Sequence, residues 1–153
     1  MKATLFALVM TSAAVAAPPV QESVSVVLGP KAYRDGDVIE ITEVTATSGN
    51  LEQGDSVTVR GRVRLDSRSS GNLSLYVTQT EGDGQEEIDP GQSKTVSRGL
   101  SAFELKATIK HKGVLHLTFY DAKTGKPFGG TYFGTSKQMN RIGDWNVGYY
   151  LAD

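Results

Sequence analysis

Two runs of alternating residues near the middle of the chain predict its central strands. In residues 55–65, Val and Leu alternate with Ser, Thr and Arg, and residues 72–80 repeat the pattern. A period of two places one set of side chains on each face, as a half-buried strand requires. Residues 66–71 are six polar or Gly residues, enough to reverse the chain. We therefore expect a central antiparallel hairpin with an apolar inner face and an Arg-bearing outer face.

Further short strands are predicted on both sides of this hairpin. They cover residues 23–28, 37–47, 93–97, 100–110, 114–120, 127–135 and, in the tail, 146–151. Residues 121–126, which contain Lys-Thr-Gly, predict a hairpin turn. No stretch shows sustained helical periodicity. About eight or nine short strands are typical of an all-β, antiparallel two-sheet β-sandwich of Ig-like architecture, and a small β-barrel is the alternative.

One irregular position is expected within these strands. In residues 37–47, Ile39 and Ile41 share a face, whereas Val44 falls on the opposite one. A bulge near residues 42–43, which adds one residue to one strand of a pair, reconciles the two patterns.

Residues 1–17 have the pattern of a secretory signal peptide. Lys2 precedes a short apolar run, and small residues at 14–16 supply a cleavage site. The remainder, residues 18–153, has the usual size of one domain. We expect its tail, residues 136–153, to pack in part and otherwise to be loosely docked.

Composition and charge narrow the classes of function. The chain has no Cys, which excludes thiol chemistry and, together with the export signal, indicates a bacterial periplasm or exterior. Its formal charge is −1, without the basic excess that nucleic-acid or anionic-membrane binding normally shows. The apolar run of the leader is too short to span a bilayer. An exported protein with no nucleic-acid partner and no membrane span is therefore expected.

The sequence shows no catalytic constellation. Its two His residues, His111 and His116, argue against a multi-histidine metal site, and we expect His116 to face solvent on its strand. The loop of residues 81–89 holds five carboxylates but lacks the spacing of a twelve-residue Ca²⁺ loop, so cation binding there is left open. We expect no cofactor, no metal and no enzyme, with a hydrolase that uses an unrecognised carboxylate site as the third interpretation.

Three arginines form a candidate binding surface on the central strand. Arg60, Arg62 and Arg64 project from one face as a cationic stripe about 13 Å long at the strand rise. Such a stripe could bind acidic groups of a ligand, or it could pair with acidic residues on a neighbouring strand such as Glu40 or Glu104.

The end of the chain supplies the main candidate site. Its candidate ligand-binding residues are Phe128, Tyr132, Trp145 and Tyr149, which lie near several glycines. Exposed, coplanar rings suit stacking on sugar rings. In the alternative interpretation Phe128 and Phe133 belong to the core, and the glycines relieve crowding.

Four segments of the chain carry a resemblance. Leu-His-Leu-Thr-Phe-Tyr-Asp and Phe-Gly-Gly-Thr-Tyr-Phe-Gly-Thr look like the end of an uncharacterised exported bacterial β-domain. Leu-Glu-Gln-Gly-Asp-Ser-Val-Thr-Val-Arg-Gly and Leu-Ser-Leu-Tyr-Val-Thr are similar to its upstream hairpin. The similarity covers about residues 37–135. It implies an exported β fold but no activity and no functional residues, because that family has no assigned activity.

These observations predict a non-enzymatic exported module that binds a cell-envelope glycan or another exported protein. The alternative is a structural envelope protein that assembles through its sheet edges. Exposed rings would favour the glycan, and buried rings with a long unprotected edge would favour assembly. The oligomeric state is not predicted.

Overall fold

The structure confirms the predicted all-β class. The computed structural model describes residues 20–82, 84–85 and 87–152, so the predicted signal peptide lies outside the described residues. The elements are β1 (Glu22–Ser23), β2 (Val27–Ala32), β3 (Val38–Ala46), β4 (Ser56–Gln79), β5 (Ser93–Thr108), β6 (Gly113–Tyr120), β7 (Pro127–Gly134), α1 (Ser136–Ile142) and the 3₁₀ helix η1 (Gly148–Leu151). Within the described ranges, no helix has the length and apolar character needed to cross a membrane.

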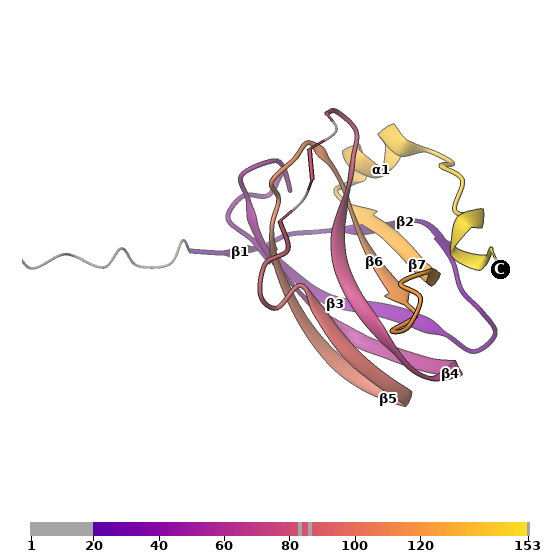
Figure 1. The fold of residues 1–153 in the computed structure, drawn as a ribbon. Helices are drawn as coiled ribbons and strands as arrows, with labels where there is room; N and C mark the ends of the chain where they lie inside the picture. The colour runs from indigo at the N-terminus through magenta and orange to yellow at the C-terminus, as the bar shows by residue number, and fades with distance from the viewer. Residues whose placement is uncertain (1–19, 83, 86, 153) are drawn as a thin grey trace, which may run out of the picture.

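The strands form one antiparallel sheet that curls into a half-barrel (Figure 1). Their order is β1-β3-β4-β6-β7-β2, and β5 pairs with β4. The expected two-sheet, Ig-like sandwich is not confirmed, because strand pairing continues through β4 from one edge to the other. The alternative, a small barrel, fits in part, because the sheet curls into half of a barrel.

β4 is one strand of 24 residues, so the predicted central hairpin is wrong. Its first half pairs with β3 and β5, and its second half pairs with β5 and β6. The register shifts between Leu65 and Ser70, where the strand changes partners. There the buried Asp37 Oδ1 accepts hydrogen bonds from the backbone N–H groups of Asp66 and Ser67, at 2.8 and 2.9 Å. The polar segment therefore bends a continuous strand, and a side chain satisfies the N–H groups that leave the ladder.

β5 bends in the same way. The two strands expected at residues 93–97 and 100–110 are one continuous strand. Gly99, which lies between the two expected ranges, has a φ of 105°. Lys94 Nζ donates to the carbonyl oxygen of Ala102, eight residues along, at 2.8 Å. A straight strand would separate these residues by about 26 Å. β4 and β5 thus bend together and fold the sheet over its core.

The main hydrophobic core lies between the curved halves of the sheet. The predicted inward faces of the strands are confirmed, since their apolar residues are buried: Val57, Val59, Val63, Leu65, Leu73, Leu75, Val77, Phe103, Leu105, Ala107, Ile109, Leu115, Leu117 and Phe119. Phe128 and Phe133 are also fully buried in this core. The interpretation that placed these two rings in the core is therefore confirmed.

The N-terminal strands connect the two edges of the sheet. β1 pairs with β3 at one edge, and β2 pairs with β7 at the other. Residues 24–26 alone connect β1 to β2, so the two edges approach within about 13 Å at this end. Val24 and Val26 pack against the main core. The strand expected at residues 23–28 is therefore divided between two edges.

Two local predictions are confirmed. The register of β3 on β4 shifts between Ile41 and Glu43, where the bulge was expected. The turn predicted at residues 121–126 joins β6 to β7, with Asp121 N–H donating to the Lys126 carbonyl oxygen at 2.9 Å.

The tail is helical and docked, so the strand expected at residues 146–151 is wrong. α1 begins with a capping box in which Thr135 Oγ1 accepts from Gln138 N–H at 3.2 Å and Gln138 Oε1 accepts from Thr135 N–H at 3.0 Å. Met139, Ile142 and Tyr150 are buried. Figure 1 shows this yellow C-terminal segment alongside β7 and β2.

The close contact of β3 with β4 can be tested at Gly61. A Cβ atom there would lie 1.9 Å from the Glu40 carbonyl oxygen and 2.9 Å from the Phe103 ring. Gly61→Ala should therefore lower the free energy of unfolding by about 2–3 kcal/mol in chemical denaturation. Gly49→Ala is the control, because no atom lies within 4 Å of its added Cβ. Equal stability of the two variants would contradict this contact.

Candidate functional site

β6 is buried on both faces. Leu117 points into the main core, whereas His116 and Thr118 lie on the opposite face and are only 7% and 0% exposed. The expectation that His116 faces solvent is therefore wrong. The C-terminal segment covers this face, and Tyr150 of η1 is fully buried against it.

A buried polar network holds the C-terminal segment on the sheet. His116 Nδ1 lies 2.6 Å from Thr118 Oγ1, and Thr118 Oγ1 donates to the Tyr150 hydroxyl oxygen at 3.0 Å. The Tyr150 ring fits because residue 130 is glycine: a Cβ atom there would lie 2.8 Å from the ring. The glycine–aromatic pattern of β7 therefore serves close packing of a ring on the strand.

Aromatic contacts extend from His116 to the edge of this covered face. The Tyr132 ring centroid lies 5.4 Å from that of His116 and 5.5 Å from that of Trp145, which it meets edge-on. The Tyr132 hydroxyl is hydrogen-bonded to Thr78 Oγ1 at 3.1 Å and to the Tyr149 hydroxyl at 2.8 Å. Trp145 is partly buried and packs against a second apolar cluster: Val114, Tyr132, Met139 and Ile142. These contacts orient the indole.

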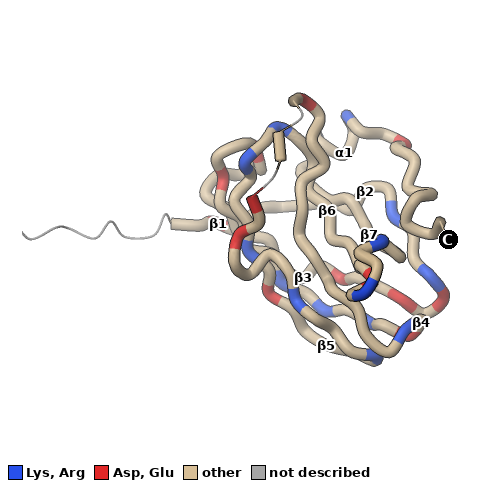
Figure 2. The backbone as a smooth tube through the Cα atoms, in the orientation of Figure 1, with Lys and Arg blue, Asp and Glu red and all other residues tan. Residues whose placement is uncertain are grey.

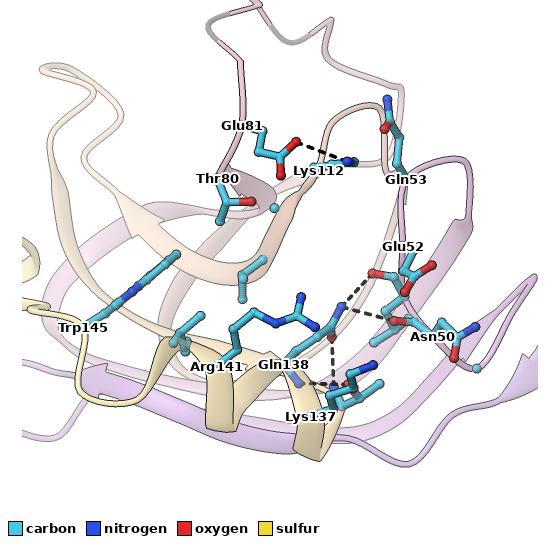
Figure 3. Close-up of a pocket in the computed structure, with 16 residues that line it drawn as sticks. Asn50, Glu52, Gln53, Thr80, Glu81, Lys112, Lys137, Gln138, Arg141 and Trp145 are labelled. Atoms are coloured by element: carbon cyan, nitrogen blue, oxygen red, sulfur yellow. Dashed lines mark hydrogen bonds and ion pairs between the residues drawn. The ribbon is translucent and has the colours of Figure 1, made fainter.

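An open pocket of about 890 Å³ lies beside Trp145 (Figure 3). α1 forms one wall, and the loops at residues 49–53, 80–81 and 112–113 form the other. The charged side chains that line it are Glu52, Glu81, Lys112, Lys137 and Arg141. Residues distant in the sequence therefore meet around one indole.

Gln138 connects the two walls of this pocket. Its Nε2 donates to the carbonyl oxygens of Asn50 and Leu51 at 3.1 and 2.9 Å, while its Oε1 caps α1. One side chain thus stabilises the start of α1 and holds that helix against the loop that precedes β4.

The predicted aromatic residues lie in different environments. Phe128 is fully buried, stacks on Phe119 at 5.4 Å and lies under the Arg68 guanidinium at 4.0 Å. Tyr132 is 3% exposed, and its ring lies beneath the C-terminal segment. Tyr149 is 45% exposed, and Trp145 lines the pocket. These rings therefore do not form one exposed, coplanar platform.

The three arginines of β4 lie among acidic residues. Figure 2 shows blue and red segments interspersed along β3, β4 and β5. The pairs are Arg60 with Glu104 at 2.7 Å and with Glu43 at 3.1 Å, Arg62 with Glu40 at 3.1 Å, and Arg64 with Asp66 at 4.0 Å. The predicted pairing with neighbouring strands is confirmed for Arg60 and Arg62, whereas the partner of Arg64 lies on β4 itself. The hydrogen bond from Arg60 lowers the pKa of Glu104.

Ion pairs also involve the acidic loop. Glu81 pairs with Lys112 at 3.2 Å, and Asp89 pairs with Lys110 at 2.8 Å. The hydrogen bond from Lys110 lowers the pKa of Asp89, which also accepts from Thr108 N–H. Across the described part of the chain, no group of three or more His, Asp or Glu side chains is placed to hold a metal ion.

The sequence-based interpretation did not find the α1 wall of the pocket. Lys137, Gln138 and Arg141 were not among the expected site residues. The signal present was the Thr-Ser-Lys-Gln spacing of residues 135–138, which is typical of a capping box at the start of a helix. It places residues 137 and 141 on one face of that helix.

Comparison with known proteins adds no relative. The chain matches no protein-family model, no curated protein sequence and no solved structure. The resemblance to an exported bacterial β-domain therefore stays a prediction, and the functional interpretation is based on the geometry of the pocket.

The buried His116 predicts a loss of stability in acid. Burial lowers its pKa from 6.5 to about 4, and the groups that face it, from Tyr76, Thr118, Tyr132 and Tyr150, carry no negative charge. Between these two pH values the unfolded chain binds more protons than the folded one. The contribution of the neutral His116 to the free energy of unfolding is therefore fully present above pH 6.5 and is lost as the pH falls towards 4. The total loss is about 3 kcal/mol.

Urea denaturation of the wild type and of His116→Gln at several pH values between about 7 and 4 measures this contribution. The stability of the variant should fall less steeply over this interval, because Gln does not titrate. Identical slopes for the two proteins would show that His116 does not carry the effect.

Proposed function

We propose that this protein is a non-catalytic module that binds a cell-envelope glycan in the pocket beside Trp145. The observation that carries the proposal is an oriented, partly buried indole on the wall of a pocket whose other walls carry polar and charged side chains. A sugar ring combines an apolar face with hydroxyl groups at its edge. Such a ligand suits a site that places an aromatic face beside hydrogen-bonding groups.

The rigidity of the indole supports this interpretation. The backbone N–H of Trp145 donates to the Ile142 carbonyl oxygen at 3.2 Å, which fixes the chain at this residue, and the Tyr132 ring meets the indole at 87°. An aromatic side chain that is already ordered loses little conformational entropy when a ligand binds. The site is therefore preorganised on the side of α1.

The opposite wall supplies hydrogen-bonding groups. Asn50 and Thr80, in the loops on either side of β4, contribute an amide and a hydroxyl to the lining of the pocket (Figure 3). The pocket volume of about 890 Å³ lies within the range of about 300–1,000 Å³ usual for small-ligand sites. Both properties suit a short stretch of an oligosaccharide.

The covered edge of β5 favours binding over assembly through sheet edges. Lys106 N–H donates to the Gly91 carbonyl oxygen and Thr108 N–H donates to Asp89 Oδ2, both at 2.9 Å. The loop before β5 thus occupies donors that an added strand would need. Covering an edge in this way is a known means of preventing edge pairing.

The envelope location is part of the proposal. The signal-peptide pattern of residues 1–17 supports it, as does a chain without Cys. In this account the pocket meets its glycan in the periplasm or outside the cell.

Replacing the indole should abolish tight binding while the fold persists. Trp145 is the only Trp, so its emission reports directly on a titration of the mature chain with chitohexaose, laminarihexaose, peptidoglycan fragments and oligogalacturonate. We expect the emission to shift and saturate with one of them. In calorimetry, Trp145→Ala should lower that affinity at least about tenfold, because the stacking surface is lost.

Leu100→Ala is the matched control, since it removes an exposed apolar side chain from β5 and not from the pocket. Its affinity should equal that of the wild type. Full affinity in a folded Trp145→Ala, as judged by circular dichroism, would contradict the proposed site. The absence of binding to every glycan would contradict the proposed function.

A further inference from the structure

We infer that the pocket recognises an acidic glycan, with Arg141 pairing with a carboxylate of the ligand while a sugar ring packs on Trp145. This inference rests on the proposed function and adds the charge of the ligand to it. Figure 3 shows the Arg141 side chain extending into the pocket between Trp145 and Gln138. The observation that supports the inference is that a guanidinium and an oriented indole line the same pocket.

The balance of charge in the pocket favours an anion. Lys112 and Glu81 pair with each other at 3.2 Å and offset one another. No ion pair involves Lys137 or Arg141 among the described residues, so the remaining charged groups of the lining are these two cations and Glu52. The α1 wall is thus positively charged on a chain whose formal net charge is −1.

The spacing of the two cations on α1 is unfavourable without a ligand. Lys137 and Arg141 are four residues apart in a helix of seven residues, so they lie on the same face. Like charges at this spacing destabilise a helix. A bound carboxylate would remove the repulsion. The capping box and the hydrogen bonds of Gln138 hold α1 in place without using either charge.

The chemistry of the two side chains specifies the ligand further. A guanidinium presents two parallel N–H groups that match both oxygens of a carboxylate, and the Lys137 ammonium adds a second positive charge nearby. The indole requires an apolar ring face close to that carboxylate. A uronic acid meets both requirements in one residue, since its carboxylate is attached to the ring that stacks.

The test compares acidic ligands with their methyl esters, in which each carboxylate is replaced by an uncharged group that is one methyl larger. Hexamers of galacturonate and of mannuronate, each as the free acid and as the methyl ester, are titrated into the mature chain by calorimetry. One acid should bind at least about tenfold more tightly than its ester, because the ester cannot form the charge-assisted pair. Its affinity should fall between about 50 and about 500 mM NaCl, as screening predicts.

Variants assign the effect to the pocket. Arg141→Gln should lower the affinity for the acid about tenfold and leave the affinity for the ester unchanged. Arg62→Gln is the matched control: it removes an arginine that is paired with Glu40 at 3.1 Å on the outer face of β4. It should bind the acid as the wild type does. If Arg62→Gln weakens binding and Arg141→Gln does not, the inference about the pocket is overturned.

The remaining outcomes separate this inference from the proposed function. Equal affinity for acid and ester overturns the acidic ligand and leaves a glycan site at Trp145. The same holds if only a neutral hexamer, such as chitohexaose, binds and Trp145→Ala abolishes that binding. If no acidic or neutral glycan binds, the proposed function and the inference both fall.

Discussion

The burial of the outer face of β6 and β7 is the constraint on which the candidate site depends. This face carries His116 and Thr118, whose polar atoms need partners once they leave water. Tyr150 supplies one partner, and Gly130 leaves room for its ring. The same docking places α1 and Trp145 beside the sheet. The pocket therefore exists because the end of the chain covers β6, a strand whose sequence pattern predicts one exposed face.

The two bent strands supply the other half of the site. Because β4 bends near Asp37 and changes partners, the loop that precedes it and the loop that follows it both reach the pocket. The loop before β4 presents Asn50, and the loop after it presents Thr80. Gln138 then joins α1 to the first of these loops. A curved sheet with a docked tail thus gathers polar side chains around one indole, as binding loops do on other rigid scaffolds.

The local sequence pattern predicted the features that depend on alternating apolar and polar residues. It missed the features that depend on residues far away in the sequence. The inward faces of the strands and the bulge near Glu43 followed from a period of two, because a half-buried strand imposes that period. The bend in β4 was interpreted as a turn, since polar residues suit both, and the deciding acceptor, Asp37, lies 29 residues before Asp66. The burial of His116 could not be predicted from its own strand, because Tyr150, 34 residues later, covers it. α1 has only seven residues, too few to show a helical period.

The most direct test of the account is to locate the bound glycan on the protein. Backbone and indole N–H resonances of residues 18–153 are assigned and followed by nuclear magnetic resonance while oligogalacturonate is added. The account predicts the largest shifts at the Trp145 indole and at Arg141, with smaller ones at Asn50 and Lys112 across the pocket. Shifts concentrated on the outer face of β4, around Arg62, with the pocket unchanged, would contradict it.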